Sequence, residues 1–284
     1  LTVVLLVLIG LAGLMIPYVS GFVSKTHDST GTWNGAALDS NMQRYLTEKM
    51  RFPNRMETLI NGAAGTAAAT DATCVAAAIN TPFCKMMDSS YFSTTTADNG
   101  TAGTTTMVAN SLAAAGITDV FYNNPDTSNA TFGSIIAGVP TTLNDGAAHV
   151  LATVAADATS VESHLASAFE RPLDNFDSTC YDYVTFGIGD QSELIGATMN
   201  TAPVHFASQG NMGPALKYNR FVAVFQVDKS GAATAGVAGA NKGCAAGMEP
   251  AKFIGTAMAM GSMAGHLWGT SHSLAHTWEN IAAN

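Results

Sequence analysis

The first 24 residues form an apolar run without a charged side chain, and the first charge is Lys25. A helix of about 22 residues would be about 33 Å long, enough to cross the roughly 30 Å hydrocarbon core of a bilayer. A secretory signal peptide has a basic start and a shorter apolar core, and this run has neither. We therefore expect residues 1–24 to be retained in the mature protein, as a membrane span or a buried helix.

Small residues and a proline interrupt this run of helix formers. Pro17 lacks a backbone N–H, so we expect the helix to kink or melt near it. Small residues allow helices to approach closely, so Gly10 and Gly13 predict a helix that packs against copies of itself. The residues expected to form this packing surface are Leu5, Leu8, Gly10, Gly13, Leu14 and Pro17.

Apolar side chains at three- and four-residue spacing predict a second helix over residues 36–50. These side chains are Leu38, Met42, Tyr45 and Leu46. Asp39 and Ser40 are typical of a helix N-terminus, and Arg51 and Pro53 are expected to close the helix. The turn-rich residues 26–35 are expected to separate it from the first helix.

The remaining pattern alternates between short helical and strand segments. Helices are predicted over 107–115, ended by Gly116, and over 160–169, with a third around Cys74 within 59–79. Strands are predicted over 119–122, 148–154, 183–188, 203–207 and 221–227.

Three biased segments complete this pattern. Residues 93–106, rich in Thr, and 231–247, rich in Gly and Ala, are expected to be loops, and the Ala- and Met-rich residues 251–278 are expected to be partly helical. The elements together predict an α+β fold with a long N-terminal helix and an antiparallel sheet. Two parts are expected, an N-terminal helix over 1–50 and a variable globular α+β domain over 51–284.

Charge is scarce in this chain of 284 residues. Twelve basic and 21 acidic side chains give a net charge of −9, and charged residues make up 12% of the chain, against roughly 25% in ordinary domains. The apolar share of 47% argues against disorder, and twelve dispersed cations give no patch for nucleic acid. A surface so poor in charge is expected to be covered by neighbouring subunits or by sugar.

Four cysteines, Cys74, Cys84, Cys180 and Cys244, are present, and no CxxC motif occurs. Three pairings are open. In an oxidising compartment we expect Cys74–Cys84 and Cys180–Cys244; the alternative is four buried thiols. The sequons Asn99-Gly-Thr101 and Asn129-Ala-Thr131 are candidate glycosylation sites, with O-linked sugar on the Thr-rich tract, or a bare loop, as alternatives.

Two groups of side chains are candidate metal ligands. Asp174, Asp177, Asp182 and Asp190 surround Cys180, and their oxygens suit calcium, although a solvated turn explains them as well. His272 and His276 stand four residues apart, near His266, which suits a shared metal on a helix; packing or a polar surface is the alternative.

Catalytic motifs are absent from the sequence. No Gly-x-Ser-x-Gly element occurs, and Gly261-Ser262-Met263-Ala264-Gly265 has its serine one place early. Gly187-Ile188-Gly189 lacks the third glycine of a dinucleotide fingerprint, and no phosphate-binding GxxxxGK[ST] is present. We therefore expect a protein that is not an enzyme and needs no cofactor beyond calcium at most.

The N-terminal run, with its glycines and the pair Pro17-Tyr18, resembles the N-terminal helix of type IV pilins and type II secretion pseudopilins. Aligning that pair with the family's proline places Leu1 on the leucine that follows the family glutamate, so the mature start is expected to precede Leu1. Residues 51–60, Arg-Phe-Pro-Asn-Arg-Met-Glu-Thr-Leu-Ile, resemble the element after the long helix in pseudopilins.

The resemblance implies a structural subunit of a type IV pilus-like extracellular filament, with copies of itself as partners and an inner-membrane precursor. A low-copy pseudopilin of a type II secretion system and a single-pass membrane-anchored surface binding protein remain alternatives. Calcium binding in the globular domain of some pilin-like proteins also raises the candidacy of the aspartates.

Non-reducing peptide mapping of the purified chain tests the disulfide prediction. We expect two cross-linked peptide pairs, Cys74–Cys84 and Cys180–Cys244, each stabilising the fold by about 2–4 kcal/mol. Four free thiols, or pairs that cross between these loops, would show the prediction wrong.

Overall fold

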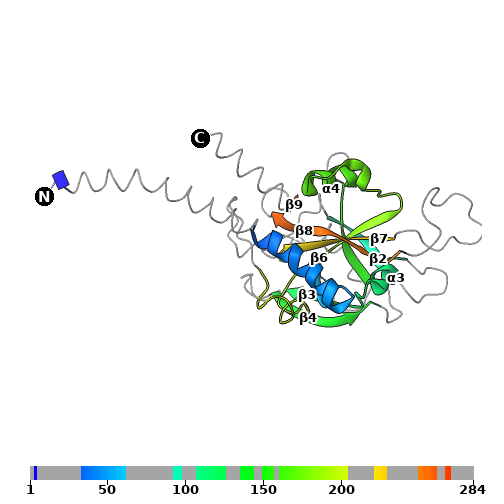
Figure 1. The fold of residues 1–284 in the computed structure, drawn as a ribbon, viewed down its shortest axis with the longest axis horizontal. Helices are drawn as coiled ribbons and strands as arrows, with labels where there is room; N and C mark the ends of the chain where they lie inside the picture. The colour runs from blue at the N-terminus through cyan, green and yellow to red at the C-terminus, as the bar shows by residue number, and fades with distance from the viewer. Residues whose placement is uncertain are drawn as a thin grey trace, which may run out of the picture.

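The computed structural model describes residues 3–4, 33–61, 92–97, 107–125, 135–143, 149–156, 160–203, 221–228, 249–260 and 266–269. They form an α+β fold with a mainly antiparallel sheet (Figure 1). A helix covers residues 33–49. The elements that follow are β1 (Met56–Asn61), β2 (Phe92–Ala97), α3 (Met107–Ala114), β3 (Asp119–Pro125), β4 (Ile135–Thr142), β5 (His149–Val154), α4 (Val161–Phe169), the 3₁₀ turn η3 (Leu173–Asn175), β6 (Tyr181–Gly187), β7 (Phe221–Asp228), β8 (Lys252–Met260) and β9 (His266–Gly269).

The described strands form one sheet of nine. Seven of them follow one another in the order β4-β3-β1-β6-β7-β8-β9, and β5 and β2 branch from this path at β6. β6 pairs with β7 along its length, with β5 at Val184 and with β1 at Gly187, so the sheet divides beyond β6. β2 pairs with β5. The β1–β3 pair is parallel, and the other described pairs are antiparallel.

β7 is buried on both faces, and successive side chains point to opposite faces of a strand. Phe221, Ala223, Phe225 and Val227 belong to the core cluster that contains Leu38 and Met42 of the 33–49 helix and Leu112 of α3. Val222 and Val224 belong to the cluster that contains Leu165 of α4. Helices therefore cover both faces of the sheet.

The helix predicted over 36–50 is confirmed, and its apolar stripe is buried. Leu38 and Met42 are fully buried and Tyr45 is 2% exposed, while Leu46 packs at the edge of the same cluster. The helix already includes residues 33–35, so the expected break over 26–35 is wrong for these three. Asp39 is not an N-terminal cap, because its carboxylate accepts a hydrogen bond from Thr256 N of β8 at 2.7 Å.

Other local predictions are confirmed with small changes at their ends. α3 ends before Gly116, whose φ is +86°. α4 begins after Ser160, whose side chain accepts from Ser163 N at 3.0 Å, the usual N-cap arrangement. The predicted strands 119–122, 148–154, 183–188 and 221–227 correspond to β3, β5, β6 and β7.

Residues 251–278 were expected to be partly helical, and where described they are strands. Alanine and methionine favour helices locally, but β8 pairs with β7 from Lys252 to Met258 and with β9 at its end. The packing of α4 on β8 also favours a glycine at position 255, because a Cβ there would lie 2.8 Å from the Phe169 ring. Tertiary pairing therefore overrides local propensity in this segment.

The loop expected over 93–106 is wrong for its first part. Residues 93–97 belong to β2, which pairs with β5 from Phe92 to Ala97. Threonine is β-branched and suits a strand. The polar composition of the segment favours a loop, and this outweighs the β-branched signal in a reading of the sequence alone.

Sequence reasoning also missed β1 and β4. β1 includes Leu59, which the sequence places in a helical segment. Leu59 has a φ of 61°, and the pairing register of β1 with β3 shifts between Glu57 and Asn61. β4 contains Pro140, which an edge strand tolerates, and β4 ends the sheet order. Pro203 is outside any strand, and residues 62–91, 204–207 and 231–247 lie outside the described residues.

A single-residue change tests how the 33–49 helix ends. Met50 follows the helix, is 86% exposed and has a left-handed φ of 57°, which costs a side chain about 1–2 kcal/mol. Met50→Gly removes this strain but raises the entropy of the unfolded chain, so we expect a net gain of about 0.5–1 kcal/mol in urea unfolding. Met50→Ala keeps the Cβ and is the control, and an equal stability for the two variants would contradict the prediction.

Candidate functional site

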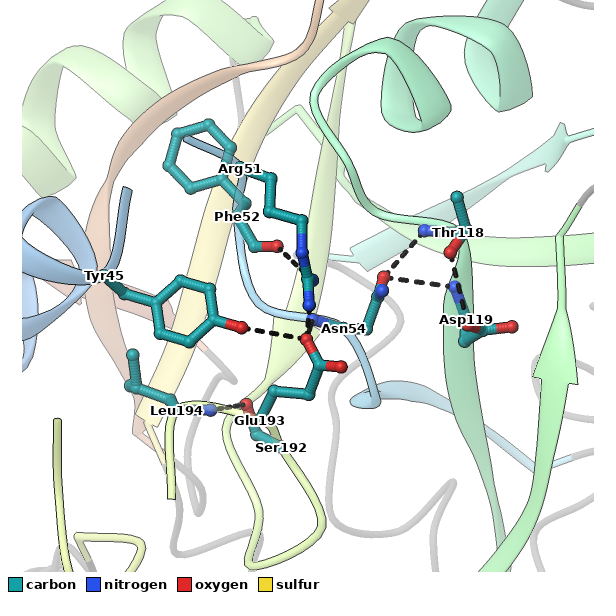
Figure 2. Close-up of polar contacts among 9 residues, drawn as sticks. All are labelled: Tyr45, Arg51, Phe52, Asn54, Thr118, Asp119, Ser192, Glu193 and Leu194. Atoms are coloured by element: carbon teal, nitrogen blue, oxygen red, sulfur yellow. Dashed lines mark hydrogen bonds and ion pairs between the residues drawn. The ribbon is translucent and has the colours of Figure 1, made fainter. Parts of the chain in front are cut away.

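Polar side chains from distant parts of the chain meet where the 33–49 helix ends (Figure 2). Glu193 Oε2 accepts from Arg51 Nη1 at 2.6 Å, from the Tyr45 hydroxyl at 3.0 Å and from Asn54 N at 3.0 Å. The Arg51 guanidinium also lies 5.8 Å from the centre of the Tyr45 ring. We call Tyr45, Arg51, Asn54 and Glu193 the Glu193 latch.

Asn54 extends the latch to the junction of α3 and β3. Its Oδ1 accepts from Thr118 N at 2.7 Å and from Asp119 N at 3.2 Å, as Figure 2 shows, and its backbone oxygen accepts from Glu193 N at 3.1 Å. Asn54 is 9% exposed. The turn after the helix is therefore bonded to two separate loops of the globular part.

Close contacts at glycines explain how these loops approach the latch. A Cβ at Gly116 would lie 2.4 Å from Arg51 Cβ, and the φ of +86° at Gly116 already disfavours a side chain. A Cβ at Gly189 would lie 1.8 Å from Glu57 Oε1. Gly116 is thus required where the chain passes over Arg51, whereas a side chain at position 189 would displace the end of the Glu57 side chain.

The electrostatics of the latch keep each group in one protonation state near neutral pH. Burial opposes ionisation of Glu193, but the hydrogen bonds from Arg51, Asn54 N and Tyr45 outweigh it, so the net pKa lies below its ordinary 4.5. The hydrogen bond to Glu193 raises the pKa of Arg51, and burial followed by contact with Glu193 raises the pKa of Tyr45. These groups are suited to holding a fixed geometry, since none is poised to exchange a proton near pH 7.

A second carboxylate fastens the other half of the helix. Asp39 accepts from Thr256 N at 2.7 Å, and the Thr256 hydroxyl donates to Gly35 O at 3.1 Å. Burial raises the pKa of Asp39, and the hydrogen bonds from Thr256 offset part of this effect. The helix is therefore bonded to β8 through Asp39 and to the 189–199 loop through Glu193.

Three of the four aspartates predicted to bind calcium have separate partners in the structure. Asp177 Oδ1 accepts from Thr179 N at 2.8 Å within its own turn, and Asp182 accepts from the Thr95 hydroxyl of β2 at 2.7 Å. Asp190 accepts from Ala202 N at 3.2 Å, and Asp174 is exposed in η3. In the described ranges, no three His, Cys, Asp or Glu side chains gather where they could hold a metal ion.

Cys180, directly before β6, is disulfide-bonded and 6% exposed. The other three cysteines lie outside the described residues, so the pairing stays a prediction. Of the first 24 residues, Val3 and Val4 are described, and they are helical. The remaining predicted site residues outside the described part are Leu5, Leu8, Gly10, Gly13, Leu14, Pro17, Asn99, Thr101, Asn129, His272 and His276, whereas His266 begins β9.

The residues that fasten the helix were not identified as a site from the sequence. Sequence reasoning places Arg51 at the end of the helix and in a family-like element, Asn54 in that element, and Tyr45 in the apolar stripe. Glu193 lies 142 residues from Arg51, and no local pattern relates two such distant residues. The detectable signal was the concentration of polar residues directly after a helix with a buried stripe.

No protein-family model, no curated protein and no solved structure matches this chain. Within the part of the chain that the structure describes, the helices are too short or too polar to cross a lipid bilayer. The contacts described above therefore carry the functional argument.

A charge-neutral substitution tests the latch. Since the pKa of Glu193 is lowered on folding, its contribution is present above its ordinary 4.5 and is lost as the pH falls through the folded value. Glu193→Gln should lower the free energy of unfolding by about 1–2 kcal/mol at pH 7, and this difference should close in acid. Urea unfolding at several pH values measures it.

Glu48→Gln is the matched control for this experiment. Glu48 pairs with Arg44 at 2.7 Å on the same helix, with side chains 43% and 62% exposed, and such pairs contribute about 0.3–0.5 kcal/mol. Equal losses in the two variants, or a difference from wild type that does not change with pH, would contradict the role given to Glu193.

Proposed function

We propose that this chain is the structural subunit of a type IV pilus-like extracellular filament. The observation that carries the proposal is the 33–49 helix, which comes after the uncharged N-terminal segment in the sequence and lies fastened along one face of a mainly antiparallel sheet. This arrangement supports a subunit in which a long N-terminal helix packs in the filament core and the α+β part forms the outer surface.

The way the helix is held supports a load-bearing role. Its apolar stripe is buried by the sheet, and carboxylates near both of its ends bind backbone N–H groups of other segments, Asp39 that of Thr256 and Glu193 that of Asn54. A subunit pulled through its N-terminal helix would pass the force directly to the sheet. A flexible tether would need none of these contacts.

The N-terminal segment supplies the driving force in this proposal. Burial of apolar area contributes about 25 cal/mol per Å², so packing most of an apolar helix of about 22 residues against its neighbours is worth tens of kcal/mol gross. The subunit would leave the inner membrane and bury the same surface against identical helices. Such contacts are heterologous and open, so they give a filament instead of a closed ring.

Two other functions fit the same sequence features. A low-copy pseudopilin would share the helix but not form long filaments, and a single-pass surface binding protein would use residues 1–24 only as an anchor. Electron micrographs of native material, together with the copy number in the cell envelope, distinguish the filament subunit from the pseudopilin. For the binding protein, removal of residues 1–24 should leave ligand binding intact.

Substitutions at the two glycines separate assembly from anchoring. Gly10→Leu with Gly13→Leu adds bulk that a close-packed helical core does not accommodate, at about 1–3 kcal/mol per site, whereas lipid adapts to it. We expect the double variant to insert into membranes as the wild type does but to lose its filaments in electron micrographs.

Leu5→Ile with Leu8→Ile is the control, because it conserves volume on the same helix and such exchanges are tolerated best. Normal filaments from the glycine variant would rule out close packing at these positions. A wild type that never polymerises would favour the pseudopilin.

A further inference from the structure

The twelve basic residues are not evenly dispersed, because four of them lie between residues 44 and 55. Two of the four are engaged, since Arg44 pairs with Glu48 at 2.7 Å and Arg51 pairs with Glu193 at 2.6 Å. The other two, Lys49 and Arg55, are exposed and form no ion pair with any described residue. Unpaired positive charge therefore remains where the 33–49 helix ends.

Acidic residues concentrate elsewhere. Apart from Glu193, which pairs with Arg51, seven of the 21 lie between residues 157 and 190, where Arg171 is the single basic residue. Arg171 donates to Ile254 O at 2.8 Å and lies 5.9 Å from the centre of the Phe169 ring, so its guanidinium is held against β8 and α4. Glu170 and Asp174, in the turn after α4, are exposed and have no ion pair among the described residues.

An exposed apolar side chain lies between the unpaired charges of each segment in the chain. Met50, 86% exposed, lies between Lys49 and Arg55 in the chain, and we call these three residues the basic patch. Leu173, 53% exposed, lies between Glu170 and Asp174, and these three form the acidic patch. An apolar centre with a charged rim is the usual composition of a protein interface.

The two patches follow helices that cover different faces of the sheet. The basic patch follows the helix that covers one face of the sheet, and the acidic patch follows α4, which covers the other face (Figure 1). The basic patch of one copy can meet the acidic patch of the next. Such a contact is heterologous, so it repeats along an open assembly.

We infer that the basic patch of Lys49, Met50 and Arg55 docks on the acidic patch of Glu170, Leu173 and Asp174 in a second copy of this chain. The inference rests on the proposed function, in which the partner is a second copy of this chain. The contact would join the globular parts of two neighbouring subunits, outside the helical core of the filament. Complementary charge would set the register of this contact, and the exposed Met50 and Leu173 would be buried in it.

Zero-length carbodiimide cross-linking of the full chain, in its native envelope fraction, tests the contact. The reagent joins an amine to a carboxylate in direct contact, with loss of water, so Lys49 should become linked to Asp174 or Glu170 in a covalent dimer identified by mass spectrometry. The yield should fall in 1 M salt, where the screening length shrinks to about 3 Å from about 10 Å at 0.1 M.

Reciprocal charge reversal leaves the reacting pair Lys49 and Asp174 intact. Arg55→Glu and Glu170→Lys should each lower the yield of this cross-link about tenfold, because each places like charges together, and the two changes combined should restore it. The matched control exchanges Arg44→Glu and Glu48→Arg on the same helix, outside the basic patch, and should leave the yield unchanged.

The possible outcomes separate this inference from the proposed function. Filaments without the Lys49 cross-link, or single reversals without effect, would overturn the contact and leave the filament standing. Cross-linked dimers in a protein that forms no filaments would support the contact and reject the filament. The absence of both would reject both.

Discussion

The structure depends on the burial of one helical stripe against β7. Phe225 stands at the centre of this contact, with ring centroids 5.1 Å from Phe52, 5.5 Å from Phe253 and 6.0 Å from Phe186. Leu38 and Met42 close the same cluster from the helix, and full burial of such a side chain contributes about 1.5–3 kcal/mol. The 33–49 helix is thus part of the core, and together with α3 it covers this face of β7.

The two carboxylates that hold the helix work in opposite electrostatic directions. Ionised Glu193 is favoured in the folded protein, since three donors outweigh its burial. Asp39 has a raised pKa through burial, so its ionisation weighs against the folded state as the pH rises above its ordinary 3.8. What this buried carboxylate provides is position. It accepts a hydrogen bond from Thr256 N and so fixes where the helix crosses β8.

Sequence reasoning recovered the elements whose signal is local. The helical stripe from Leu38, the capped helix after Ser160 and the alternation of β7 all lie within short windows, and the structure contains each of them. β8 was misread because its alanines and methionines gain strand structure only by pairing with β7. Glu193 could not be connected to Arg51 or Asn54, because that connection exists only once the sheet has brought the two loops together.

The same contacts that hold the helix also hold the two proposed docking patches. Arg51 of the latch lies in the chain between Met50 and Arg55, and Asn54 precedes Arg55 directly. On the opposite face, Arg171 joins the turn after α4 to β8, the strand that also binds Asp39. The spacing between the patches is therefore set by the sheet and not by loose loops. In a heterologous assembly the angle from one copy to the next depends on that spacing, so in the proposed filament the latch would help to set the angle between neighbouring subunits.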